Sequence, residues 1–261
     1  MFEIIKNIPL LAQIPSAEIK IEKLAGLTNN NYQITTPEQI FILRIPRAET
    51  NININREHEF ANANMAYQLG LSPKILWQNN MGMSLCKYLE DASVLTPDKL
   101  KSPQTLERIS LLLQTLQHSK RCFEGELNTH KISRYLNSYY KLCTPAHQQT
   151  LQADYQTALK RLENLDEKRE PVPAHIDLVP ENILQQNEKL WLIDWEYSAM
   201  ASPYWDLATL CNAGGFDQTS EQHLLESIFK DYTEEDRVYL GYYRKIVKSV
   251  SDCWLCAYQK T

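Results

Sequence analysis

The sequence predicts an α+β fold with two lobes, a small β-rich lobe over residues 1–89 and a larger, mainly helical lobe over residues 90–261. Short runs rich in β-branched and aromatic residues are concentrated before residue 90, which is typical of strands. Beyond the polar stretch "EDASVLTPDKL", apolar residues recur at spacings of three and four, which is typical of amphipathic helices. With 261 residues, the chain is long enough to bury a core in one large domain or two modest ones.

In the first lobe, the strands are expected at residues 18–25, 31–36, 39–45, 74–77 and 83–89. The first three are separated by short turns, of which "TPEQ" is one, so they should form an antiparallel meander. The stretch "NREHEFANANMAYQLG" carries Ala61, Met65 and Leu69 at intervals of four and ends at Gly70, so it predicts a helix between the third and fourth strands.

In the second lobe, helices are expected at residues 105–118, 131–141, 147–165 and 234–260. The first of these has Leu106, Ile109, Leu113 and Leu116 on one face. A strand pair over residues 183–193, turned around "QNE", is the only expected interruption of this helical region.

Composition and charge exclude several classes of protein. The net charge of −5 and the lack of a long Lys/Arg cluster argue against a nucleic-acid surface. No stretch is long and apolar enough to span a bilayer, and the N-terminal residues lack the pattern of a secretory signal. The six cysteines are scattered, so reduced thiols and a cytoplasmic location are expected.

Cys253 and Cys256 form a C-x-x-C pattern, which is found in redox and zinc sites. No second cysteine pair or histidine pair completes a zinc set, and the pattern falls within a predicted helix. We therefore expect two ordinary thiols here.

The stretch "HIDLVPENIL" and the aspartate that ends "LWLID" carry the chemistry that can be read from residue types. Mg²⁺ prefers oxygen ligands, and Asn182 and Asp194 could supply them to a metal-bound nucleotide. Asp177 would then be free to accept a hydrogen bond from an attacking hydroxyl group. The alternative is that Asp177 and Asn182 serve only as turn and cap residues.

These motifs resemble those of the choline/ethanolamine kinase and aminoglycoside phosphotransferase superfamily. The shared pattern is H-x-D-x-x-x-x-N, then a strand ending in I-D-W-E-Y, then D-L-A, and it is strongest here over residues 172–210. The match is most similar to bacterial choline kinases, with thiamine kinases next. The resemblance extends over nearly the whole chain and implies a protein kinase-like bilobal fold, with ATP and Mg²⁺ in the cleft between the lobes.

The resemblance also implies roles for single residues. Asp177 would be the catalytic aspartate, and Asn182 and Asp194 the metal ligands. His175 would support the catalytic loop, and Asp206 would brace it. The alternative for Asp206 is a simple N-cap of a helix that begins at the next residue.

For the nucleotide, "LAGLTNNNY" resembles the family's phosphate loop, which implies contacts from Gly26, Thr28, Asn29 and Asn31; an asparagine-rich turn is the alternative. The connector "SLCKYLED" resembles the family hinge, where backbone groups near Cys86 to Tyr88 would receive the adenine.

The third strand, "FILRIP", has Arg44 at the position where protein kinases have a lysine. Choline kinases resemble this sequence in having an arginine there. A guanidinium group can pair with phosphates and with a helix carboxylate. Glu59 is the expected partner, and Glu57 stays open as an alternative; an exposed helix-face glutamate is the simpler reading of Glu59.

The resemblance implies a small-molecule alcohol as the acceptor, most simply choline or another cationic amino alcohol. A quaternary ammonium requires aromatic faces and a nearby carboxylate. Candidates are Glu196, Tyr197 and Trp254, with Trp195, Tyr204 and Trp205 also near in sequence, although such residues are also common in cores. The alternatives are a thiamine, ethanolamine or aminoglycoside kinase and, more remotely, a non-catalytic nucleotide-binding module.

Overall fold

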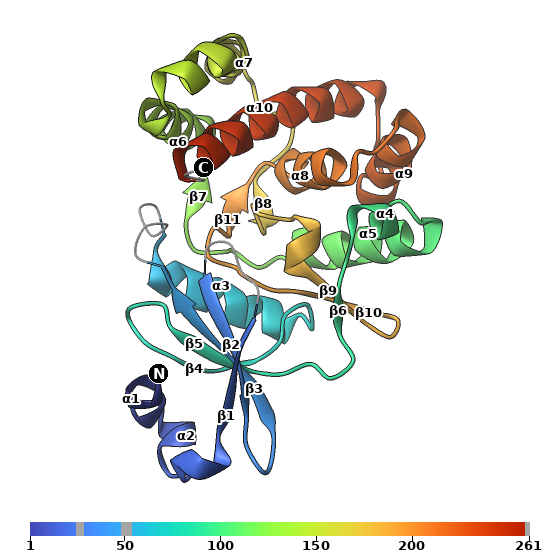
Figure 1. Ribbon diagram of the computed structural model, residues 1–261. Helices are drawn as coiled ribbons and strands as arrows, with labels where there is room; N and C mark the ends of the chain where they lie inside the picture. Colours follow the sequence, from blue (N-terminus) through green and yellow to red (C-terminus); the bar gives the residue numbers. More distant parts are fainter. Residues whose placement is uncertain (25–28, 48–53, 259–261) are drawn as a thin grey trace.

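The structure, a computed structural model, describes residues 1–24, 29–47 and 54–258. It has an antiparallel sheet in its N-terminal part and a mainly helical C-terminal part (Figure 1). Both match the fold class expected from the sequence. In the portion of the chain that is described, no helix combines the length and the apolar character needed to cross a membrane.

The N-terminal sheet has five strands in the order β1-β2-β3-β5-β4. The strands are β1 (Lys20–Leu24), β2 (Asn29–Thr35), β3 (Ile40–Pro46), β4 (Ile75–Gln78) and β5 (Ser84–Lys87). Each neighbouring pair is antiparallel, so the expected meander and the two later strands are confirmed.

The two faces of this sheet have different coverings. Residues alternate between the faces along a strand, so Phe41 and Leu43 of β3 point to one side and Arg44 to the other. The first side packs on short N-terminal helices, α1 (Phe2–Lys6) and α2 (Pro9–Ala12), through Ile5, Ile8 and Leu11. The sequence did not predict these helices, because helices of four or five residues are too short to show a periodic pattern.

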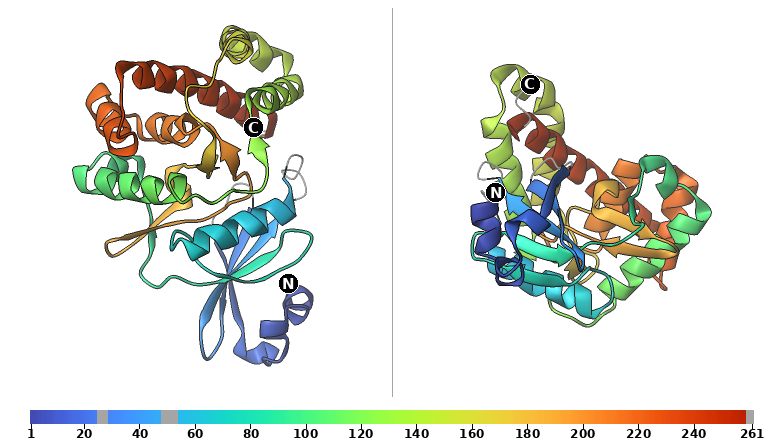
Figure 2. Two further views of the ribbon diagram at one scale, coloured as in Figure 1. Left: turned by 180° about the vertical axis from the view of Figure 1, so that it is seen from behind. Right: turned by 60° about the horizontal axis from the view of Figure 1, so that its bottom comes forward.

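The predicted helix after β3 is confirmed as α3 (Arg56–Gln68), whose N-cap Asn55 accepts hydrogen bonds from the N–H groups of Glu57 and His58. In Figure 1 and Figure 2, α3 lies between the sheet and the helical part of the chain. Its buried residues Ala63 and Ala66 belong to the core of the helical part rather than to the core beneath α1 and α2.

The C-terminal part contains the expected long helices and others that were not expected. The helices are α4 (Pro97–Leu100), α5 (Pro103–Gln117), α6 (Thr129–Leu142), α7 (Pro145–Glu163), α8 (Tyr204–Gly214), α9 (Gln218–Ile228) and α10 (Glu234–Tyr258). Side chains of Ser102, Asn128 and Thr144 cap the N-termini of α5, α6 and α7. The helix α10, seen at the top of Figure 1, packs on α6, α7 and α8 and closes the core.

The expected strand pair is confirmed as β9 (Ile183–Gln186) and β10 (Lys189–Leu192), but it is not the only interruption of the helices. A short strand β6 (Ser93–Val94) adds to it, and a second sheet has the order β7-β11-β8. This second sheet contains β7 (Glu126–Leu127), β8 (Val172–Ala174) and β11 (Ala199–Ala201). Strands of two or three residues carry no alternating pattern, which explains why the sequence did not reveal them.

Candidate functional site

The hairpin of β9 and β10 brings two of the candidate residues together. Its register pairs Ile183 with Leu192, so the residue before β9 and the residues after β10 lie at the same end of the hairpin. The N–H of Ile193 donates to the carbonyl of Asn182 at 3.0 Å, and this hydrogen bond holds the open end of the hairpin together. Asn182 and Asp194 therefore lie beside each other although twelve positions separate them in the sequence.

Asp177 belongs to the same group of polar side chains. The amide nitrogen of Asn182 donates to the Oδ2 atom and to the carbonyl oxygen of Asp177, both at 2.9 Å. Burial and the charge of Asp194 raise the pKa of Asp177 to about 7, while the hydrogen bond from Asn182 opposes that rise. The carboxyl group can therefore change protonation state near neutral pH, as a proton acceptor should.

The backbone before Asp177 is held in a strained shape by α8. Ile176 has φ +74°, a conformation that a β-branched residue rarely adopts. The carboxylate of Asp206 accepts the N–H groups of His175 and Ile176 at 2.7 and 2.8 Å, and the indole N–H of Trp205 donates to the carbonyl of Ile176 at 2.8 Å. Because α8 begins at Tyr204, Asp206 lies inside the helix and is not its N-cap.

His175 is completely buried, and burial lowers its pKa to about 4. Its Nε2 atom lies 2.9 Å from the carbonyl oxygen of Ile193, so in the neutral ring this nitrogen carries the proton and donates. The ring also packs on Trp195, with 4.6 Å between the ring centroids. These contacts connect the loop before Asp177 to the segment that carries Asp194, which is a structural arrangement and not that of a general base.

Arg44 extends from the sheet into this group of side chains. Its guanidinium group forms ion pairs with Glu59 of α3 and with Asp194, and its side chain is 13% exposed. Burial lowers the pKa of Arg44, but the charges of Asp194, Glu59 and Glu196 outweigh it and raise the pKa overall. Glu59 is thus the helix carboxylate that pairs with Arg44, whereas Glu57 is exposed.

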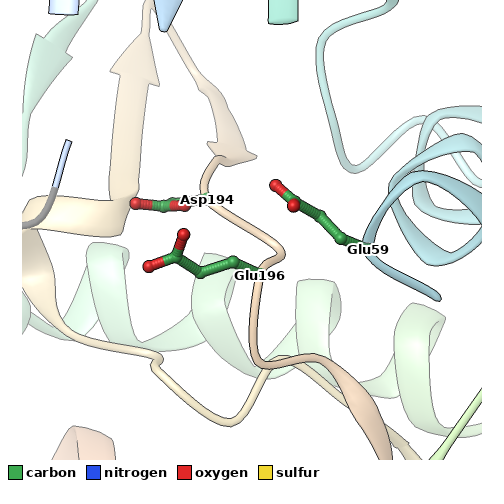
Figure 3. Close-up of side chains that lie close together, drawn as sticks. All are labelled: Glu59, Asp194 and Glu196. Carbon is green, nitrogen blue, oxygen red and sulfur yellow. The ribbon is translucent and has the colours of Figure 1, made fainter. Parts of the chain in front are cut away.

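A second guanidinium group, that of Arg56, contacts the carboxylates around Arg44. The sequence did not indicate a role for it. Arg56 lies 2.6 Å from a Glu59 oxygen and 3.3 Å from a Glu196 oxygen. Carboxylate oxygens of Glu59, Asp194 and Glu196 lie within 4.8 Å of one another, and Figure 3 shows the three side chains converging. With two cations already between them, these carboxylates form an ion-pair cluster.

The electrostatics of the cluster explain how Glu196 tolerates its position. Burial, together with the negative charge of Asp194, raises the pKa of Glu196 to about 8, and the charge of Arg44 opposes the rise. A protonated Glu196 leaves two carboxylates facing two guanidinium groups at neutral pH. The structure therefore places Glu196 among the arginines, although the sequence suggested that it contacts the acceptor.

The other nucleotide candidates lie on or near the sheet. Asn29 is buried and its amide donates to Asp194 at 3.2 Å. Asn31 lies opposite Arg44 in the β2–β3 register, so both face the same side of the sheet. Gly26 and Thr28 lie outside the described residues.

At the expected hinge, burial raises the pKa of the Cys86 thiol to about 11, so the thiol stays protonated. The N–H of Tyr88 donates to the carbonyl of Ile40 at 3.0 Å and is therefore occupied within the sheet edge. An adenine contact in this region would therefore use a backbone group other than the Tyr88 N–H.

Aromatic rings from α6 and α10 gather near this centre. Trp254 and Tyr258 of α10 lie 5.5 Å apart between ring centroids, and Tyr139 of α6 lies 6.0 Å from Tyr258 and 6.3 Å from Tyr135. Burial and the charge of Glu196 raise the pKa of Tyr197, and Tyr139 and Asp177 also contribute to the rise. Tyr197 is therefore near both Tyr139 and Asp177.

Three aromatic residues that were near in sequence belong to the core instead. Trp195 donates to Ser72 Oγ at 3.1 Å, the hydroxyl of Tyr204 pairs with Asp236, and Trp205 holds the carbonyl of Ile176. All three are at most 5% exposed. They are corrected from acceptor candidates to structural residues.

The arrangement combines three chemical capacities. Asn182 and Asp194 offer oxygen atoms of the kind that Mg²⁺ prefers. Arg44 and Asn29 offer donors to anionic oxygens from the sheet side. Asp177 offers an acceptor with a pKa near 7 beside them. Together these groups suit transfer of an anionic group to a hydroxyl.

Comparisons with known proteins agree with this chemistry. A family model of choline/ethanolamine kinases matches residues 21–253. Protein LicA of Haemophilus influenzae is 30% identical over 211 residues, which are 80% of this chain and 62% of that protein. The crystal structure of choline kinase LicA from Streptococcus pneumoniae has a TM-score of 0.80 at 29% identity, covering 98% of this chain and 90% of that one. A structure of LicA in complex with AMP has a TM-score of 0.80 at 28% identity, with the same coverages.

Proposed function

Because the chain belongs to the choline/ethanolamine kinase family, we propose that it transfers the γ-phosphoryl group of ATP to the hydroxyl group of choline or a related amino alcohol. The observation that carries this proposal is the convergence of the loop that holds Asp177 and Asn182 with Asp194 after β10, with Arg44 extending to them from the sheet. The choline kinase activity named for a relative of similar structure supports the choice of acceptor.

In this proposal, Asp177 accepts the hydrogen bond of the acceptor's hydroxyl group, orients its oxygen for in-line attack, and takes up its proton as the bond to phosphorus forms. The pKa of about 7 suits this role, since part of the population is ionised at neutral pH. The contacts from Asp206 and Trp205 keep the preceding peptide groups in place while this happens.

The nucleotide would lie between the sheet and the hairpin of β9 and β10. Arg44 and Asn29 would donate hydrogen bonds to phosphate oxygens, and Asn182 and Asp194 would hold Mg²⁺, which neutralises charge on the phosphates. The amide nitrogen of Asn182 already serves Asp177, so its oxygen is the end suited to a metal. Arg44 contacts Asp194 directly here, so nucleotide binding should exchange that contact for ones to the phosphates.

We propose that the acceptor's ammonium group lies against the rings of Trp254 and Tyr197, which are both partly exposed. A methylated ammonium cannot donate strong hydrogen bonds, so aromatic faces are its natural surroundings. The carboxyl group of Glu196 is held by Arg56 and Arg44. A primary ammonium such as that of ethanolamine would have three N–H donors to satisfy, and tyrosine hydroxyl oxygens are the acceptors that this aromatic group itself supplies.

The proposal also includes the lobe boundary and the cellular location that the sequence led us to expect. We place the lobe boundary between residues 89 and 90, where the chain leaves β5 for the short strand β6. We also propose a cytoplasmic location, because the reaction consumes ATP and all six cysteines are free thiols.

The test is an acceptor panel with Mg-ATP. Choline, ethanolamine, thiamine and kanamycin would be compared by ADP release and by mass spectrometry of the phosphorylated product. We expect kcat/KM for choline to exceed that for ethanolamine by about tenfold or more, since desolvated cation–π contacts are worth about 1–2 kcal/mol each. The Asp177→Asn variant measures the acceptor-independent background. Absence of any acceptor-dependent ADP release would contradict the proposal, and a preference for another alcohol would reassign the acceptor.

A further inference from the structure

The helix α3 is joined to the C-terminal part of the chain along its whole length. At its start, Glu59 takes part in the ion-pair cluster with Asp194. In its middle, Ala63 and Ala66 are buried in the core of the helical part. Just after its end, the carbonyl of Leu71 accepts the N–H of Leu192 at 2.7 Å.

Asn62, in the middle of α3, makes the most complete of these connections. It is 0% exposed, and its amide nitrogen donates to the carbonyl of Glu124 at 3.1 Å and to the carbonyl and hydroxyl oxygens of Ser198 at 3.0 and 3.2 Å. Its Oδ1 atom accepts the N–H of Glu124 at 2.7 Å. One buried side chain thus binds two segments of the C-terminal part to a helix that lies beside the N-terminal sheet.

The Ser198 segment leads to the proposed active site, and the Glu124 segment is joined to it. Ser198 follows Asp194 by four residues, and its hydroxyl donates to the carbonyl of Trp195 at 2.6 Å. Glu124 precedes Gly125, whose carbonyl accepts the N–H of Met200 at 3.0 Å beside the β7–β11 pairing. The two segments are therefore already joined to each other, and Asn62 adds the helix to them.

Asn62 and Glu59 are three positions apart on one helix, so they lie on neighbouring turns of the same face. Fixing Asn62 sets the position of α3 along its axis and its rotation about that axis. These in turn set the place where the Glu59 carboxylate meets Arg44. A buried amide with all of these bonds made is a specific connection, since any other placement of α3 would leave buried polar groups unpaired.

We propose that Asn62 is a positioning residue: it fixes α3 to the Glu124 and Ser198 segments so that Glu59 holds Arg44 in the orientation used for the nucleotide phosphates. This inference rests on the proposed kinase function for its kinetic consequence. Its structural part, the attachment of α3, is independent of that function. It also implies that opening of the site involves movement of the sheet relative to α3, and not movement of α3 away from the C-terminal part.

The test compares Asn62→Ala with Asn64→Ala, a matched control on the exposed side of the same helix. We expect Asn62→Ala to weaken Mg-ATP binding and lower kcat/KM for ATP by about tenfold to a hundredfold, because small displacements of positioned groups have effects of that size. KM for the alcohol should change less than kcat/KM for ATP, because α3 carries no acceptor residue and Asn62 reaches the acceptor side only through Ser198, next to Tyr197. Asn64→Ala should leave all three quantities unchanged.

A second variant guards against simple unfolding. Asn62→Leu keeps nearly the same side-chain volume and adds no buried charge but removes the donors to Glu124 and Ser198, so we expect a folded protein with the same selective loss for ATP. Hydrogen exchange should be faster at the Glu124 amide in Asn62→Ala and faster along α3 in both variants. Unchanged exchange along α3, or an equal loss for ATP and for the alcohol, would overturn the inference.

A double-mutant cycle shows whether Asn62 acts through Glu59 or only stabilises the fold. If Asn62 acts through Glu59, adding Asn62→Ala to Glu59→Gln should cost less than about twofold in kcat/KM for ATP, because the group being positioned is already lost. Fully multiplicative effects would overturn the inference. If the wild-type chain phosphorylates none of the alcohols tested, the proposed function fails, while ATP affinity and hydrogen exchange still decide the role of Asn62.

Discussion

The substitution Arg44→Ala tests the ion-pair cluster at the proposed nucleotide site. Arg44 pairs with Glu59 and Asp194, and its NH1 atom lies 3.8 Å from an oxygen of Glu196. The side chains of Glu59 and Glu196 are 4% and 3% exposed, so water cannot replace the lost guanidinium group easily. Among the described residues, Arg56 is the cation that would still pair with both of them.

The burial of Glu59 and Glu196 determines how much unfolding free energy Arg44→Ala should lose. Removing one partner of a buried ion pair typically costs about 3–5 kcal/mol. Because Arg56 keeps its contacts with Glu59 and Glu196, we expect the lower end, about 3 kcal/mol. For a chain of this size, that corresponds to a decrease in Tm of about 6–12 °C.

The loss of unfolding free energy in Arg44→Ala should depend on pH, in a direction that follows from the pKa values in the cluster. Burial and the charge of Asp194 already hold the pKa of Glu196 above its unfolded value, and removing Arg44, whose charge opposes that rise, should raise it further. Stability linked to such groups is present at low pH and is lost as pH rises through the folded pKa. The difference in unfolding free energy between wild type and Arg44→Ala should therefore shrink between pH 8 and pH 5.5.

Thermal and urea unfolding followed by circular dichroism would measure both effects. Arg108→Ala is the matched control, since its partner Glu188 is 84% exposed and surface pairs contribute only about 0–1 kcal/mol. If Arg44→Ala is no more destabilising than Arg108→Ala, or if its deficit grows as pH falls, the account of the cluster is refuted.

The remaining predictions concern the catalytic, acceptor and structural residues. Asp177→Asn should lower kcat by about 10²–10⁴-fold while the Kd for Mg-ATP, measured by calorimetry, changes less than about twofold; equal losses would show that its role is misassigned. In the wild type, kcat/KM should rise with pH through about 7, because Asp177 must be ionised to accept the proton, and a flat profile from pH 6 to 8 would contradict this. Trp254→Ala should raise KM for choline by about tenfold without changing that for ATP, and Trp191→Ala, on the β9–β10 hairpin, should change neither. Although burial raises the pKa of Asp236, hydrogen bonds from Arg169 and Tyr204 lower it overall, so Asp236→Asn should reduce the unfolding free energy by about 3 kcal/mol at pH 7. That difference should close as pH falls below about 4, where the unfolded-state aspartate binds its proton; a difference independent of pH would contradict the pairing.

The sequence allowed prediction of the elements that are long or strongly patterned. The meander, α3, the long helices and the β9–β10 hairpin all show periodic apolar residues or clear turn residues. The hairpin register also explains why a motif spread over residues 175–194 was informative, since it brings Asn182 next to Asp194. The short strands β7, β8 and β11 exist only through pairing with one another, which no local pattern records.

Residues whose contacts are purely tertiary were missed for the same reason. Asn62 and Arg56 sit in a predicted helix, and nothing in their immediate sequence distinguishes them from solvent-facing residues. The aromatic group had a usable signal, because Tyr135 and Tyr139, like Trp254 and Tyr258, are four apart on predicted helices and so share a face. The place of Glu196 beside Tyr197 suggested an acceptor contact, and the structure adds pairing with arginines that its sequence neighbours did not reveal.

The most direct test of the account is a crystal structure of the wild-type protein with Mg²⁺, a non-hydrolysable ATP analogue and choline. We predict the metal on the oxygen atoms of Asn182 and Asp194, the phosphates against Arg44, and the choline hydroxyl within hydrogen-bond distance of Asp177. A metal held by Glu59 and Glu196, or a choline hydroxyl remote from Asp177, would contradict it.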